Sequence, residues 1–154
     1  MRPIATEHPA RPRGLPEPIR AVLDAALPPP LVALALRLGI AAPFFMSGRA
    51  KVDGLLTLNE TTFFLFREDF RLPLLPPDLV AYMATYAEHL FPLLIVLGLG
   101  TRVSALALLT MTLVIQIFVV PTGWPTHLLW LGPLLYLLAN GPGRFSLDRL
   151  FRLD

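Results

Sequence analysis

The chain contains no cysteine and has few charged residues. The absence of cysteine excludes disulfides, iron–sulfur ligation by thiolates and any dithiol relay carried by this chain. Charged residues make up 16% of the sequence, whereas soluble domains carry about 25%. Hydrophobic residues make up 55% and come in long blocks rather than at amphipathic spacing. This composition is wrong for a soluble domain of 154 residues and indicates a membrane protein.

Several other signals are missing. Residues 1–18 are rich in proline and arginine and lack an apolar core segment, so we expect no cleavable signal peptide and an uncleaved first span. The glycine-rich turns at 98–102 and 141–143 are not followed by Lys-Ser/Thr, which argues against a phosphate-binding loop. The sequence shows no serine triad and no metalloprotease helix, so we assign no catalytic residue and no metal site. The net charge of +2 is mild and does not suggest nucleic-acid binding.

Four apolar stretches predict an all-α fold, an integral membrane four-helix bundle with short interfacial helices at both ends. The predicted bundle covers residues 31–140, and the four spans are expected at about 31–48, 79–99, 103–120 and 124–140. The fourth is short for a crossing of about 20 residues. Between the first two spans, Asn59 precedes a short helix that it is expected to cap.

Each end of the chain predicts a polar or amphipathic segment. Residues 1–30 are interpreted as a Pro/Arg-rich cytoplasmic tail followed by a helix from Pro18 to Leu27. That helix has one apolar stripe, which suits either the membrane surface or packing on the protein's own end. Residues 141–154 are interpreted as a cytoplasmic cap and a short amphipathic helix that begins after Ser146.

Arginine and lysine indicate the orientation. Four spans place both termini on one side, which would collect eight basic residues, while the opposite side would collect four. Because basic residues accumulate on the cytoplasmic side, we expect both termini in the cytoplasm and a plasma (inner) membrane location. The eight are Arg2, Arg11, Arg13, Arg20, Arg102, Arg144, Arg149 and Arg152, and the four are Arg49, Lys51, Arg67 and Arg71.

The second span carries Glu88 and His89 near its middle. A carboxylate at that depth needs a partner. Arg37 lies eleven residues before Gly48, or about 16 Å from the outer end of its span, and Glu88 lies about 14 Å from the outer end of its own. These matching depths predict a buried ion pair between Arg37 and Glu88.

This pair has two interpretations. It could only set the register of two helices, or it could border a cavity that opens toward the outer half. Lys51, His89, Gln116 and His127 are all expected at middle depth or above, where they would be candidates for binding a polar head group such as a quinone, or for a proton path. Two axial histidines on one haem would need closer levels than the 10 Å or more expected between His89 and His127.

The chain resembles the DoxX family of small four-span membrane proteins over residues 31–150. The likeness is carried by Arg37, Phe45, Gly48 and Lys51, by 74–77 leading into 86–88, by 97–102, by Gln116 and Trp130, and most specifically by 141–148. The resemblance implies a plasma-membrane four-helix bundle associated with redox chemistry. Relatives include a membrane subunit of thiosulfate:quinone oxidoreductase and a partner in an oxidoreductase complex that handles oxidative stress. The long lead before the first span is not part of the shared pattern.

Three hypotheses follow. The favoured one is an accessory or non-catalytic membrane subunit of a redox system. It would bind a protein partner, and its cofactor would be a quinone. The second is a small carrier or proton-coupled transporter with Arg37 and Glu88 as its switch. The third is a membrane scaffold that recruits soluble partners through its tail and surface helices. The lipid bilayer is a partner in all three hypotheses. The sequence leaves open whether the chain forms a homo-oligomer.

Overall fold

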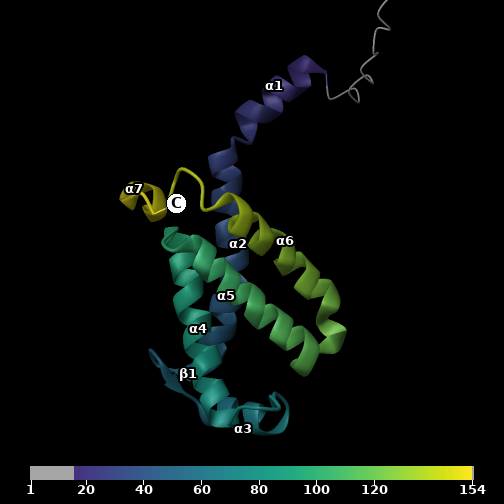
Figure 1. Cartoon of the computed structure of the whole chain (residues 1–154), viewed down its shortest axis with the longest axis vertical. Helices are drawn as coiled ribbons and strands as arrows, with labels where there is room; N and C mark the ends of the chain where they lie inside the picture. The colour runs from purple at the N-terminus through teal and green to yellow at the C-terminus, as the bar shows by residue number, and fades with distance from the viewer. Residues whose placement is uncertain (1–15, 154) are drawn as a thin grey trace, which may run out of the picture.

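The structure is a computed structural model that describes residues 16–153 and is helical almost throughout (Figure 1). Two pairs of antiparallel helices form the bundle, α2 with α4 and α5 with α6. The elements in chain order are α1 (Glu17–Ala26), α2 (Pro29–Ala50), β1 (Val52–Asp53), β2 (Thr57–Leu58), α3 (Glu60–Glu68), α4 (Pro77–Leu97), α5 (Thr101–Val114), the π-helical turn η1 (Ile115–Val119), the 3-10 turn η2 (Pro121–Gly123), α6 (Trp124–Asn140) and α7 (Leu147–Phe151).

Proline and glycine mark where the helices begin and end. Proline stands in the first turn of α1, α2, α4 and α6, where its missing N–H would have had no intrahelical partner. α4 ends at Gly98 in the left-handed conformation, and Gly100 takes the same conformation just before α5. Asn59 caps α3 by accepting from the Thr62 amide at 2.8 Å, as the sequence predicted.

Two apolar clusters hold the helices together. The larger one joins α2, α4, α5 and α6 through Ile40, Ala41, Phe44, Ile95, Ala105, Leu108, Leu134 and Leu137. The smaller one fixes α3 and the short β-hairpin against the first turns of α4 through Val52, Leu58, Phe66, Val80 and Ala81. The hairpin, in which Val52 pairs with Leu58, was not predicted. The all-α membrane bundle was predicted and is confirmed.

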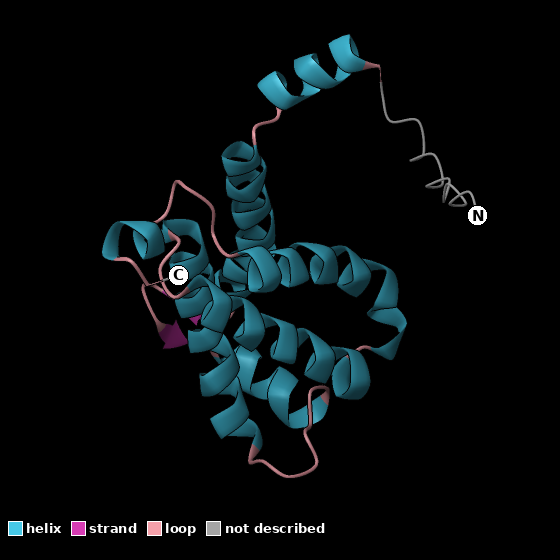
Figure 2. Ribbon diagram, turned by 45° about the horizontal axis from the view of Figure 1, so that its top comes forward, coloured by secondary structure: helices cyan, strands magenta, loops and turns pink. Residues whose placement is uncertain are grey.

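Among residues 16–153, three helices are long and apolar enough to cross a membrane, namely Pro29–Ala50, Pro77–Leu97 and Thr101–Val119. α6 has 17 residues and is packed along α5. A fourth crossing by α6 therefore stays a prediction. The predicted tail lies mostly in residues 1–15, outside the described residues. The helix predicted after it is observed as α1, and its place on the membrane surface stays a prediction. Figure 2 shows α1 standing apart from the bundle, and none of its residues is buried.

The segment after α6 folds back over the turn between α4 and α5. The Asp148 carboxylate accepts from the backbone amides of Gly100 at 2.6 Å and Thr101 at 2.9 Å, which caps the N-terminus of α5. The Asp148 amide donates to the Gly98 carbonyl at 2.7 Å. Ser146 caps α7 through the Arg149 amide, as predicted. Residues 141–148 thus close one end of the bundle.

Gly98 and Gly100 form a matched pair for testing this closure. Both have positive φ, at 67° and 58°, but a Cβ at Gly98 would lie 2.6 Å from the Ser146 Cβ, whereas a Cβ at Gly100 meets nothing within 4 Å. Gly100→Ala should cost about 1–2 kcal/mol of stability for the left-handed backbone alone. Gly98→Ala should lose about 1–3 kcal/mol more through overpacking. Thermal unfolding in detergent measures both, and equal losses would contradict the tight contact at Gly98.

Candidate functional site

A buried ion pair joins α2 to α4. Lys51 Nζ lies 2.7 Å from Glu88 Oε2, and the two side chains are 14% and 5% exposed. Ser47 lies between them, because its hydroxyl accepts from Lys51 Nζ at 2.7 Å and donates to Glu88 Oε1 at 3.1 Å. A charge-assisted network of this kind makes it tolerable to place a lysine and a glutamate among apolar helices.

The backbone brings these three residues together. Ser47 and Lys51 are four residues apart, so they share one face at the end of α2. Gly48 lets α4 approach that face closely, because a Cβ there would lie 2.9 Å from the His89 ring and 3.1 Å from the Glu88 Cβ. Any larger residue at Gly48 would push α4 away from the ion pair.

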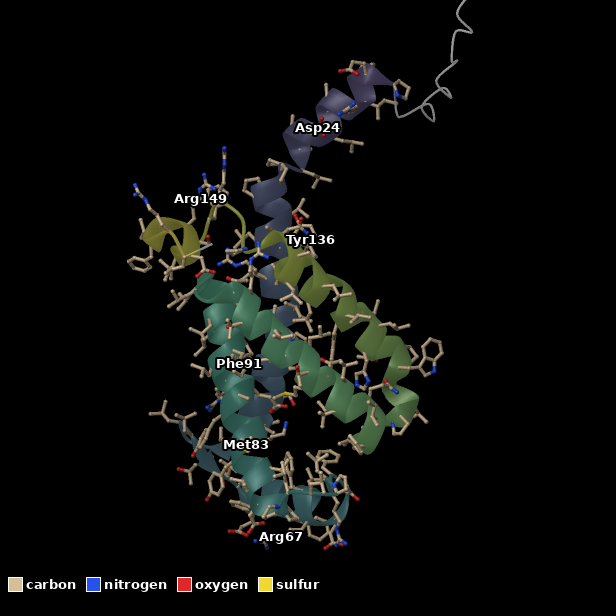
Figure 3. All side chains as sticks on the ribbon, viewed as in Figure 1. Asp24, Arg67, Met83, Phe91, Tyr136 and Arg149 are labelled. Atoms are coloured by element: carbon tan, nitrogen blue, oxygen red, sulfur yellow. The ribbon has the colours of Figure 1, made fainter. Side chains whose placement is uncertain are left out.

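The ion pair lies in the wall of a cavity of about 810 Å³. α4 forms one wall, including Met83 and Phe91 (labelled in Figure 3), and α5 with η1 forms the other. Figure 1 shows α5 and α6 diverging from α4 toward the end of the bundle where α3 lies. Most of the lining is apolar, and its polar members are Ser47, Lys51, Glu88, Thr110 and His127.

A second polar group faces the same cavity from α6. His127 Nδ1 lies 2.6 Å from Gln116 Oε1, and the Gln116 amide nitrogen donates to the Pro121 carbonyl at 2.7 Å. Because that second bond orients the amide, Gln116 presents its oxygen to the ring, so His127 Nδ1 carries the proton. Gln116 lies in the π-helical turn η1, a local geometry that is frequent at functional sites. The Trp130 ring lies 5.3 Å from the His127 ring.

The predicted site residues therefore separate into two groups. Lys51, Glu88 and His127 line the cavity, and Gln116 supports His127 without lining it. His89 faces away, toward α2, where its ring packs edge-on against Phe45. Its Nδ1 lies 2.7 Å from the carbonyl of Thr85, one turn earlier in α4. Within residues 16–153, no three His, Cys, Asp or Glu side chains gather closely enough to hold a metal ion.

The predicted Arg37–Glu88 ion pair is wrong. Arg37 is 2% exposed, and its guanidinium donates to backbone carbonyls. Its Nε bonds to Ile95 at 2.7 Å, one Nη bonds to Val96, and the other bonds to Phe145 at 2.5 Å. Arg37 therefore occupies the C-terminal end of α4, where the helix dipole favours a cation. The Ile95 carbonyl is shared, because it also accepts from the Gly98 amide at 3.1 Å.

The error came from the assumed register. The depths of Arg37 and Glu88 match only if the outer ends of the first two spans lie at one level. In the structure Gly48, near the end of α2, lies beside Glu88 and His89, so α4 continues for eleven residues beyond that level to its first residue, Pro77. Arg37 is bonded to Ile95, seven residues from Glu88, which corresponds to about 10 Å along the helix.

Sequence reasoning missed two residues. Ser47 was not among the predicted site residues. Its spacing of four from Lys51 at a helix end indicates that the two side chains share one face. Asp148 was not among the predicted site residues, but it is 3% exposed and caps α5. No local pattern could reveal that contact, because its partners are about 48 residues away in the chain.

The fold and site define an all-α membrane protein with a buried ion pair beside an apolar cavity. The chain belongs to the DoxX family, whose sequence model matches residues 32–121. It is also similar to an uncharacterized protein of Haemophilus influenzae (strain ATCC 51907 / DSM 11121 / KW20 / Rd), with 32% identity over 132 residues, 77% of this chain and 82% of that protein. No solved structure was found to match the chain.

The ion pair makes a specific prediction for stability. Lys51→Met leaves the Glu88 carboxylate buried without its cation, so it should destabilise the protein by about 3–5 kcal/mol. The double variant Lys51→Met/Glu88→Gln removes both charges and should recover most of that loss. Thermal unfolding in detergent at neutral pH measures each variant.

The control is the exposed pair Arg67–Asp78, whose side chains are 54% and 49% exposed. Arg67→Gln should change stability by no more than about 1 kcal/mol. A loss in Lys51→Met no larger than that control, or a double variant as unstable as Lys51→Met alone, would show that the buried charges are not coupled.

Proposed function

We propose that this chain is an accessory membrane subunit of a redox system and that its cavity holds a quinone. The observation that supports the proposal is the buried Lys51–Glu88 pair in the wall of a large, otherwise apolar cavity. The volume of about 810 Å³ falls in the range of about 300–1,000 Å³ that is typical of ligand sites. An apolar lining with a few polar groups suits an amphipathic molecule with an isoprenoid chain.

The polar groups of the lining suit both redox forms of a quinone head group. Lys51 has three donors, and two of them are directed at Ser47 and Glu88. The third is directed at the Ser47 carbonyl at 3.3 Å, the longest of the three bonds, and it would be redirected to a quinone carbonyl when the head group binds. His127 donates from Nδ1 to Gln116, so Nε2 is the ring nitrogen that would bond to a quinol hydroxyl.

An accessory role fits the residue inventory better than catalysis. The chain has no cysteine that could carry sulfur or act as a dithiol. A sulfur, metal or flavin centre would therefore belong to a partner protein, and this subunit would present the quinone to it. The carrier hypothesis used Arg37 and Glu88 as a switch, and Arg37 is instead bonded to carbonyls at the end of α4.

The same proposal includes a plasma (inner) membrane location, α6 as the fourth crossing and both termini in the cytoplasm. The basic residues support it, since eight would lie on the side of the termini and four on the other. The end of the bundle at α7 then faces the cytoplasm, and the β-hairpin and α3 lie on the outer side.

Because the chain lacks cysteine, single cysteines can report this orientation directly. Leu55 in the hairpin turn is 87% exposed, and Leu153 beyond α7 is 64% exposed. In intact spheroplasts, a membrane-impermeant maleimide should label Leu55→Cys, whereas Leu153→Cys should react only after permeabilisation. The reverse pattern would place the termini outside, and labelling of both sites would reject the four crossings.

Quinone binding can be measured by the fluorescence of Trp130, which lines the cavity. The other tryptophan, Trp124, is 58% exposed and is replaced in Trp124→Phe, which leaves a single reporter. Decylubiquinone added to this variant in nanodiscs should quench the fluorescence saturably. Ala107→Leu adds bulk to the cavity wall and should weaken binding by about tenfold or more, equal to at least about 1.4 kcal/mol.

The matched control is Ala42→Leu, because Ala42 is exposed on α2 and does not line the cavity. Its binding curve should overlay that of the reporter variant. Quenching that rises linearly without saturation, or equal weakening in Ala42→Leu and Ala107→Leu, would reject the quinone site.

A further inference from the structure

A second, more polar cavity lies at the opposite end of the bundle, beside α7. Its volume is about 470 Å³. Three parts of the chain form it: Pro29 and Pro30 at the start of α2, Tyr136 and Asn140 at the end of α6, and Arg144 and Arg149 in the C-terminal segment. Figure 3 shows Tyr136 and Arg149 at this same end of the molecule. This cavity shares no lining residue with the cavity beside Glu88.

The backbone after α6 is shaped to enclose this cavity. Gly141 and Gly143 have φ values of 74° and 82°, in the left-handed region that favours glycine. A Cβ at Gly143 would lie 2.8 Å from the Ala33 Cβ, so the segment crosses α2 in direct contact. The cavity is therefore closed on one side by a tightly placed loop.

The charge at this cavity is positive. Neither Arg144 nor Arg149 forms an ion pair within residues 16–153, and both are exposed. The neighbouring carboxylate, Asp148, is directed inward and accepts from the Gly100 and Thr101 amides. Two arginines without a carboxylate partner can bind a phosphate group through several parallel hydrogen bonds.

The surroundings favour a lipid as the source of that phosphate. Large apolar side chains next to the arginines are exposed, with Phe145 at 64%, Leu150 at 70%, Phe151 at 59% and Leu153 at 64%. The cavity also lies where the membrane-spanning helix α2 begins. An amphipathic segment with arginine beside exposed phenylalanine and leucine is typical of the membrane interface. Basic pockets between helices at this level bind the head groups of anionic lipids.

We infer that this cavity binds the phosphodiester head group of an anionic phospholipid, with Arg144 and Arg149 on the phosphate and the apolar side chains of the C-terminal segment beside the acyl chains. The polar side chains of Tyr136 and Asn140 are placed to bond to the rest of the head group. The site would anchor the C-terminal closure of the bundle to one leaflet. It does not depend on the quinone proposal.

The test is a titration of the full chain with lipid in detergent, in which the melting temperature is measured at each lipid concentration. Dioctanoyl phosphatidylglycerol should raise the melting temperature saturably, whereas dioctanoyl phosphatidylcholine and inorganic phosphate at the same concentrations should not. Arg144→Gln/Arg149→Gln should weaken the phosphatidylglycerol response by about tenfold or more, equal to at least about 1.4 kcal/mol. Both side chains are exposed and donate no hydrogen bond within the described part of the chain, so the variant should fold.

The matched control is Arg67→Gln/Arg71→Gln, which removes the same charge from exposed positions at the other end of the bundle. Its response to phosphatidylglycerol should equal that of the unmodified chain. An equal response to inorganic phosphate would show that the cavity takes a free anion and would overturn the lipid assignment. An equal response to phosphatidylcholine, or an equal loss in the control, would also overturn it.

Discussion

A buried arginine needs hydrogen-bond acceptors for its guanidinium, and Arg37 has them in the backbone carbonyls at the end of α4. Its guanidinium is surrounded by the carbonyls of Ile95 and Val96 and by that of Phe145. The last carbonyls of a helix carry partial negative charge and can accept further hydrogen bonds, so they replace a carboxylate as counter-group. One side chain therefore ties α2, the end of α4 and the C-terminal segment together.

This contact sets the register of α2 against α4, and the register decides where the functional groups lie. With Arg37 at the end of α4, the last turn of α2 falls beside Glu88, and Lys51 becomes its partner. The first turns of α4 then extend past α2, where α3 and the hairpin cover them. The space between that extension and the diverging α5 and α6 is the cavity, so the ion pair and the cavity follow from one constraint.

The candidate site was predictable in its members but not in its pairing. The polar residues in apolar spans, Glu88 and Lys51 among them, stand out in the sequence because charges are rare at that depth. Gln116 and His127 were both expected to face the head group, whereas in the structure Gln116 bonds to His127 and only His127 lines the cavity. His89 was grouped with them, yet it faces α2, because a neighbour of Glu88 on a helix points about 100° away.

The all-α class and the approximate helix bounds could be predicted from local signals in the sequence, because long apolar blocks and first-turn prolines act within a few residues of the chain. The need of Arg37 and Glu88 for a partner was predictable in the same way, because both lie within or beside apolar spans. Their partners follow only from the packing of the helices, which gives Arg37 backbone carbonyls and gives Glu88 the Lys51 side chain. Helical rise measures depth within one span, but the offset between two spans depends on packing, on the close approach at Gly48 and on a C-terminal segment about 100 residues away.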